Sequence, residues 1–140
     1  MSFLLDTNAV SEPQRPRPDP GYRSWLESQS ADDLHISALT VGELMRGARS
    51  LDDGPRRTRI EAWIAEALAL FADRVLPIDV TVASVWSGVS LSYRKHGLTA
   101  GAVDELIAAT AIAHDLVLVT RNTRHFEASG CRLLSPWSAP

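Results

Sequence analysis

The chain has 140 residues, of which 45% are hydrophobic, and a formal net charge of −3. This length and composition fit one globular domain, residues 1–140, and the acidic balance argues against a protein that coats nucleic acid by bulk electrostatics. No apolar run approaches the roughly 20 residues that a membrane span needs, and the N-terminus lacks a signal-peptide pattern. Cys131 is the only cysteine, so no internal disulfide can form and we expect a cytoplasmic location.

Short apolar runs alternate along the chain with longer stretches of helical period. In chain order, we predict a strand at 3–5, a Pro-rich loop at 13–20, a helix at 21–28, a weak strand at 35–37, a helix at 39–50 and another around the apolar stripe 60–71. There follow a strand at 75–78, a helix that Asp79 caps, a helix from 101 or 102 to 114, a strand at 117–119 and a last short strand near 132–134. Pro77 lacks an amide hydrogen, which predicts an edge position for its strand.

The alternation of strands and helices predicts an α/β fold, with a central parallel sheet covered by helices on both faces, that is, a three-layer α/β/α sandwich. In such sheets, functional residues gather at the carboxyl ends of the strands. That rule selects Asp6, which follows the first strand, and residues 120–122, which follow the strand at 117–119.

Three carboxylates stand out by their sequence context. Asp6 ends an apolar strand, Glu43 lies among apolar and small residues, and Asp104 opens an otherwise almost uncharged helix. Clustered carboxylates repel one another, and a divalent ion relieves that repulsion; oxygen ligands suit Mg²⁺ or Mn²⁺ rather than zinc. Singly, each acid has an ordinary structural reading as well: Asp6 as a helix cap, Glu43 as an ion-pair partner and Asp104 as a first-turn helix acid.

Four segments carry a family resemblance: residues 4–8 (LLDTN), 40–44 (TVGEL), 104–111 (DELIAATA) and 118–122 (LVTRN). In this order they resemble the motifs of PIN-domain toxins, and the VapC/FitB subgroup in particular. Residues 8–13 and 136–137 extend the similarity to both ends of the chain. Each motif is weak alone, but four in the same order are specific.

The resemblance implies a metal-dependent endoribonuclease in which Asp6, Glu43 and Asp104 bind Mg²⁺, or Mn²⁺ in its place. Water activated by the metal would cut RNA phosphodiester bonds, leaving a 3′-hydroxyl and a 5′-phosphate. The resemblance also implies a toxin of a type II toxin–antitoxin system. Such toxins are held inactive by a cognate antitoxin protein, which also binds operator DNA, and homodimers are common among them. DNA would therefore be contacted only indirectly, and no membrane is involved.

The pattern departs from the family at one position. Many members have a fourth acid where this chain has Asn122, whose amide oxygen is still a ligand for a hard cation but brings no charge. This puts metal affinity, and a second metal site above all, in question. Asp115 and Glu105 are alternative sources of a fourth carboxylate, although neither matches the family position.

Other polar residues have a supporting role in this hypothesis. Thr7 and Asn8 match the residues after the first acid, and Thr120 matches a hydroxyl residue that often faces the metal. We expect Arg46, one turn beyond Glu43, and Arg121 to contact RNA phosphate. The four histidines, including His125, show no metal-ligand spacing and are interpreted as ordinary surface or partly buried residues.

Two other functions remain open from the sequence. One is an aspartyl-phosphate phosphatase or receiver domain with Asp6 as nucleophile, although Asn8 stands where the phosphatase pattern has an aspartate and Lys95 follows no strand. The other is a non-catalytic binding module of the same fold, in which Asn122 has weakened the site.

Overall fold

A computed structural model describes residues 1–138 of the chain, and a five-stranded parallel sheet runs through its centre. The strand order is β3-β2-β1-β4-β5, so β1 and β4 lie side by side in the middle although more than 100 residues separate them. The strands are β1 (Phe3–Leu5), β2 (Leu34–Ser37), β3 (Val75–Leu76), β4 (Val117–Val119) and β5 (Leu133–Leu134). The predicted parallel sheet is confirmed.

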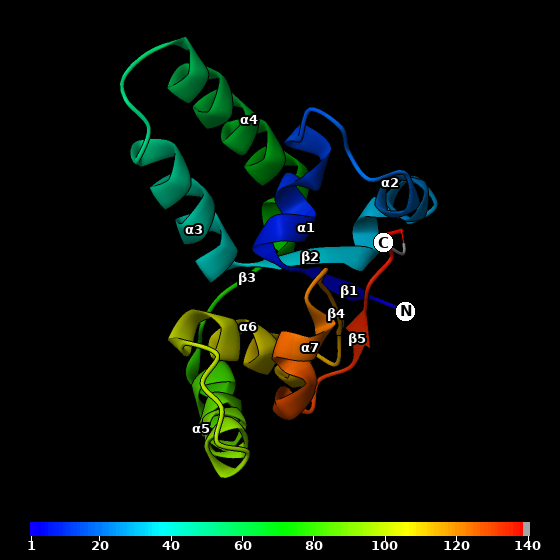
Figure 1. The fold of residues 1–140 in the computed structure, drawn as a ribbon, viewed down its shortest axis with the longest axis vertical. Coiled ribbons are helices and arrows are strands. Elements are labelled where there is room, and N and C mark those ends of the chain that lie inside the picture. The colour runs from blue at the N-terminus through cyan, green and yellow to red at the C-terminus, as the bar shows by residue number, and fades with distance from the viewer. Residues whose placement is uncertain (139–140) are drawn as a thin grey trace.

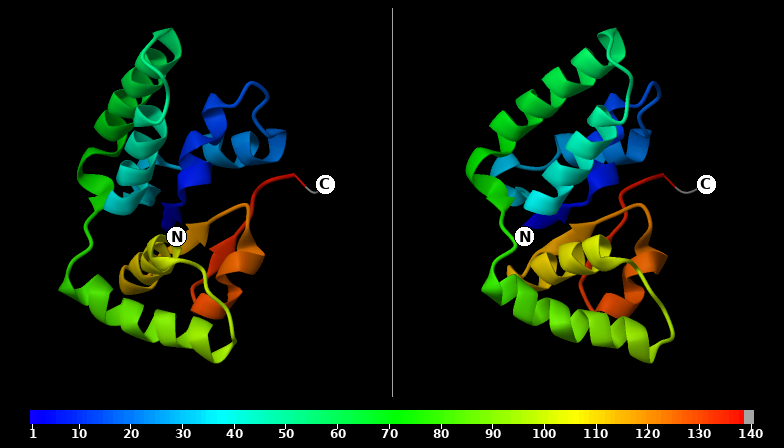
Figure 2. Two further views of the ribbon diagram at one scale, coloured as in Figure 1. Left: turned by 60° about the vertical axis from the view of Figure 1, so that its left-hand side comes forward. Right: turned by 90° about the vertical axis from the view of Figure 1, so that its left-hand side faces the viewer.

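Helices cover both faces of this sheet (Figures 1 and 2). On one face lie α1 (Thr7–Ser11), α2 (Pro20–Glu27), α3 (Ala38–Arg49) and α4 (Pro55–Phe71). On the other lie α5 (Val80–Lys95), α6 (Ala102–Ala113) and α7 (Thr123–Phe126). Short 3₁₀ turns link them: η1 (Glu12–Gln14), η2 (Ala31–Asp33), η3 (Ala72–Arg74) and η4 (Glu127–Ser129). The predicted three-layer sandwich is confirmed, and no helix within residues 1–138 is long and apolar enough to cross a membrane.

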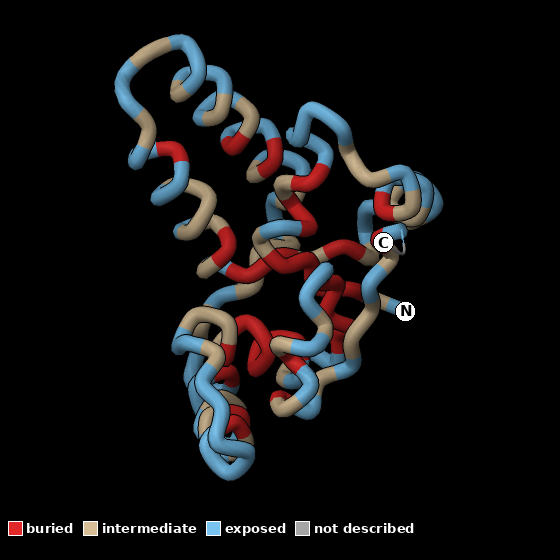
Figure 3. The backbone as a smooth tube through the Cα atoms, in the orientation of Figure 1, coloured by how far each residue is buried: buried red, intermediate tan, exposed pale blue. Residues whose placement is uncertain are grey.

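Two hydrophobic cores, one on each face of the sheet, follow from the two-residue period of the strands. Leu4 and Leu118 point toward α5, α6 and α7, where they pack with residues such as Ile107. Their neighbours Leu5 and Val119 point the other way, into the core under α1, α2 and α4. Burial is accordingly densest at the strands and lowest at the outer helix faces (Figure 3).

Carboxylate side chains cap the starts of three helices. The carboxylate of Asp6 accepts the Ala9 amide, that of Asp19 accepts the Tyr22 amide, and that of Asp79 accepts the Val82 amide. Each bond satisfies one amide that the first turn of a helix leaves free. The predicted cap at Asp79 is therefore confirmed.

Several predicted boundaries were wrong. The third strand ends at Leu76 rather than residue 78, because Pro77 has no amide to donate, but its edge position is confirmed. The segment 13–20 is not all loop, since Pro13 lies in η1 and Pro20 opens α2. Helices α1 and α7 were not predicted, because five and four residues are too few to display a helical period.

Candidate active site

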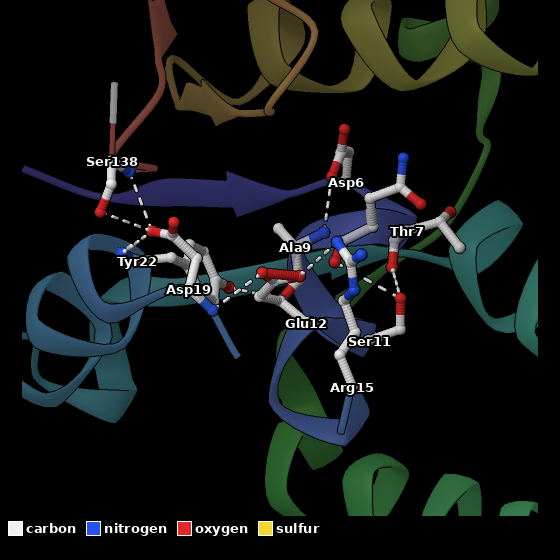
Figure 4. Close-up of polar contacts among 10 residues, drawn as sticks. Asp6, Thr7, Ala9, Ser11, Glu12, Arg15, Asp19, Tyr22 and Ser138 are labelled. Atoms are coloured by element: carbon white, nitrogen blue, oxygen red, sulfur yellow. Dashed lines mark hydrogen bonds and ion pairs between the residues drawn. The ribbon is translucent and has the colours of Figure 1, made fainter. Parts of the chain in front are cut away.

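Asp6 is the buried centre of the candidate site. It follows β1, its amide donates to the Val119 carbonyl at 3.1 Å, and its carboxylate accepts the Ala9 amide at 2.8 Å (Figure 4). Only 8% of the residue is exposed. The hydrogen bonds that end the β1–β4 ladder and begin α1 therefore fix Asp6 at the carboxyl edge of the sheet.

Thr120 lies beside Asp6 for the same topological reason. Leu5 pairs with Val119 in the parallel register, so the next residue of each strand emerges at the same edge. The Thr120 side chain is buried, it lowers the pKa of the Asp6 carboxyl, and its hydroxyl oxygen accepts the Asn122 amide at 3.1 Å. The structure thus places Thr120 next to the first acid.

Glu43 and Asp104 approach Asp6 from the two helical layers. Glu43 lies on α3, where its Oε1 accepts a hydrogen bond from the Thr7 hydroxyl at 2.5 Å. Asp104 lies in the first turn of α6, where the helix dipole favours a negative charge. Burial is the main cause that raises the pKa of Asp6; bonds from Thr120 and Ala9 oppose it, and the charges of Asp104 and Glu43 reinforce it. The charges of two acids that are far away in the sequence therefore reach the Asp6 carboxyl.

The donor set fits a hard divalent cation in an open site. Within residues 1–138, no group of three or more His, Cys, Asp or Glu side chains is arranged so that it could hold a metal ion. Mg²⁺ does not require such a group, because it commonly keeps several waters and binds one or two carboxylates together with substrate phosphates. Carboxylates whose charges raise the Asp6 pKa gain stability from a cation between them.

The other predicted residues lie around this centre with less direct contacts. Asn122 is exposed and uses its backbone: the amide donates to Thr120, and the carbonyl accepts the His125 amide at 3.2 Å. Asn8 and Arg121 are exposed and line the same small hollow beside the site. Arg46 is exposed on α3, one turn beyond Glu43.

The structure distinguishes between Asp115 and Glu105, the two alternative sources of a fourth carboxylate. Asp115 follows the opposite end of α6, about 16 Å along the helix from Asp104, and its carboxylate accepts a hydrogen bond from Arg132 at 2.9 Å. Asp115 is therefore too distant to contribute. Glu105 is buried next to Asp104 in the first turn of α6.

His125 contacts one of the three acids, although its sequence context did not predict a role in the site. Its Nε2 lies 3.0 Å from Oδ2 of Asp104. Spacing among histidines in the sequence can predict metal ligands, but it cannot predict that a histidine pairs with an acid on another element. The available signal was the place of His125 three residues after Asn122, in the segment that follows β4 and forms the short helix α7.

The family model of the PIN domain matches residues 3–130. This chain belongs to the PIN-domain family. The PIN domain described here is 38% identical to Toxin FitB of Neisseria gonorrhoeae over 136 residues, which are 96% of this chain and 98% of that protein. It is 36% identical to VapC ribonuclease Y4jK of Sinorhizobium fredii over 136 residues, 96% of this chain and 97% of that protein.

Solved structures agree with these relatives. The crystal structure of FitAcB from Neisseria gonorrhoeae matches this PIN domain with a TM-score of 0.91 at 38% identity, over 98% of this chain and 99% of that chain. A toxin–antitoxin complex from Klebsiella pneumoniae matches with a TM-score of 0.74 at 27% identity, over 99% and 100%. The predicted resemblance is confirmed, and nucleases of this family generally depend on a divalent cation.

Proposed function

We propose that this PIN domain, residues 1–140, is the toxin of a type II toxin–antitoxin pair and acts as a metal-dependent endoribonuclease. The observation that supports the proposal is that Asp6, at the carboxyl edge of the sheet, lies within reach of the charges of Glu43 and Asp104, which raise the pKa of its carboxyl. The ribonuclease named among its relatives is similar over nearly its whole length, which supports the same reaction class.

Each acid has a defined part in this proposal. Asp6, Glu43 and Asp104 hold one divalent cation, Mg²⁺ with Mn²⁺ able to replace it. When bound, the cation activates water and stabilises charge on the attacked RNA phosphate. Thr120 and the Ala9 amide hold the Asp6 carboxylate, and Thr7 holds that of Glu43.

The RNA would approach from the solvent side of this edge. Arg46 and Arg121 are exposed near Glu43 and Thr120, and guanidinium groups make bidentate contacts with phosphate. Local contacts of this kind do not require a positive net charge. They would place a phosphodiester bond over the three acids.

A cognate antitoxin is the proposed protein partner, and the toxin–antitoxin complex from Klebsiella pneumoniae with the same fold supports it. We further propose a homodimer and a cytoplasmic location. DNA would be bound only through the antitoxin, because the net charge of −3 gives this chain no bulk attraction to a duplex.

The test uses the full chain purified free of any partner and incubated with mixed cellular RNA. Mg²⁺, Mn²⁺ and a chelator are compared, and Asp104→Asn is the variant that removes one acid. Asp115→Asn is the matched control, since it removes an acid from the opposite end of the same helix. We expect cleavage that requires the cation, is lost in Asp104→Asn, persists in Asp115→Asn and leaves 3′-hydroxyl ends.

The alternatives give different results in the same experiment. Absence of both cleavage and metal binding in the folded wild-type chain would contradict the proposal and favour a non-catalytic binding module. Incorporation of phosphate on Asp6 from a phosphodonor would instead indicate the receiver or phosphatase reading.

A further inference from the structure

We propose that His125 is a positioning residue for Asp104: its imidazole N–H holds one carboxylate oxygen of this acid and leaves the other directed to the cation. The inference rests on the proposed function and assigns a role in that same site. It concerns a residue that has no acidic group and lies on a helix of only four residues, α7.

The contact between the two side chains is well formed. Nε2 of His125 lies 3.0 Å from Oδ2 of Asp104, and the side chains are 33% and 38% exposed. An ionised carboxylate can only accept, so Nε2 carries the hydrogen in this pair. Among residues 1–138, no other hydrogen bond to the Asp104 carboxylate is present, so His125 alone limits its rotation in this way.

His125 is itself held in place from several sides. Its amide donates to the Asn122 carbonyl at 3.2 Å, and its carbonyl accepts the Tyr93 hydroxyl at 2.8 Å. Its ring packs edge-on against buried Phe126, with centroids 5.2 Å apart and planes at 87°. The imidazole therefore starts from a backbone tied to both α5 and the loop after β4.

The other two acids show why such a partner matters. Asp6 is held by the Ala9 amide and Thr120, and Glu43 is held by Thr7. Without His125, Asp104 would be the one acid of the three free to turn into solvent. It is half-exposed, and its rotamers would compete with metal binding.

The chemistry of ligating carboxylates gives the size of the effect. A carboxylate that binds a cation through one oxygen is commonly hydrogen-bonded through the other, and loss of that outer partner weakens metal affinity by about 10- to 100-fold. The amide of Asn122 contributes no charge near this site, so the orientation of each remaining carboxylate weighs more in the affinity.

The test measures Mn²⁺ binding to the partner-free full chain by calorimetry. His125→Phe keeps a flat ring against Phe126 but removes the donor, and His125→Gln restores an N–H at a similar reach. His114→Phe, at the exposed end of α6 away from Asp104, is the matched control. Thermal unfolding in chelator checks the fold of each variant, and His125→Ala is used instead if His125→Phe unfolds early.

We expect Mn²⁺ affinity to fall by about 10- to 100-fold in the donor-free variant and to stay within about threefold of wild type in His125→Gln and His114→Phe. A folded donor-free variant with wild-type affinity would overturn this inference alone, provided that Asp104→Asn does weaken binding. A wild-type chain that binds no Mn²⁺ would overturn the proposed function and this inference with it.

Discussion

Asp6 meets two demands with one carboxylate. It caps α1 through the Ala9 amide, and the charges of Glu43 and Asp104 raise the pKa of its carboxyl. The structural and functional readings of this residue are therefore not alternatives. The cap fixes the side chain that the proposed cation would bind, and the cost is a carboxylate that is poorly hydrated when ionised.

The raised pKa of Asp6 predicts how its substitution changes stability. Because its pKa in the folded chain exceeds the ordinary value of 3.8, the folded state binds more protons than the unfolded state between these two values. Stability contributed at this position therefore falls as the pH rises through that window. Asp6→Asn keeps an oxygen for the Ala9 amide and removes the buried charge, so we expect it to be more stable than wild type at pH 7 in chelator.

Chemical denaturation over a range of pH would measure this difference. The advantage of Asp6→Asn should vanish as the pH falls below 3.8, where Asp6 is protonated in both states. Mg²⁺ should stabilise the wild type by mass action and leave Asp6→Asn unchanged. An Asn variant that is less stable than wild type throughout would contradict the prediction.

At the scale of elements, helix α2 is tied to the C-terminal segment that crosses it. Asp19 accepts the Ser138 amide at 2.9 Å (Figure 4). The Gly21 amide donates to the Ser138 hydroxyl at 3.1 Å. Trp137 stacks on Tyr22 with centroids 4.4 Å apart. Trp137 and Ser138 thus cover the core beside α2.

Gly21 is predicted to be necessary for this closure. A Cβ there would lie 2.7 Å from the Ser138 hydroxyl oxygen and 2.9 Å from the Pro136 carbonyl oxygen, so the C-terminal segment would have to move. We expect Gly21→Ala to destabilise the fold by about 1–3 kcal/mol, as overpacking does. The measurement is chemical denaturation.

Gly88 provides the control for that substitution. It is exposed in the middle of α5, and a Cβ there would have no neighbour within 4 Å. Gly88→Ala should therefore stabilise the helix by about 0.5–1 kcal/mol through reduced backbone entropy. Equal effects of the two substitutions would argue against a close approach at Gly21.

At the scale of the whole molecule, RNA binding would depend on where the fold places individual arginines and not on the net charge. The net charge is −3, so RNA gains no general attraction and must be held by local cations. The parallel sheet brings its strand ends to one edge; the exposed Arg121 follows the end of β4, and the exposed Arg46 lies one turn beyond Glu43 on α3.

Removal of one such arginine should weaken RNA binding without changing the metal site. In the Asp104→Asn background, which would prevent cleavage, we expect Arg121→Ala to lower affinity for single-stranded RNA uniformly and to reduce the salt-dependence slope by about 0.7–1. Binding would be measured by fluorescence anisotropy at several salt concentrations. Arg23→Ala removes an arginine paired with Glu27 on α2 and is the control; if it has the same effect, the arginine contact is not local.

The sequence alone determined the fold class, and it predicted the three acids of the proposed site. Two-residue and helical periods predicted the parallel sandwich because burial of apolar faces is encoded locally, and motif order identified the family. It also selected Asp6 and Thr120 by the rule for strand ends, and the structure places these two residues next to each other.

Only the tertiary structure decided which neighbours hold the acids. The pairing of Thr7 with Glu43 joins α1 to α3, and that of His125 with Asp104 joins α7 to α6. That Asp115 is too distant to provide a fourth carboxylate follows only from the direction and length of α6. Local periodicity reports which face of an element is buried, but a hydrogen bond between side chains on separate elements depends on how those elements pack in three dimensions.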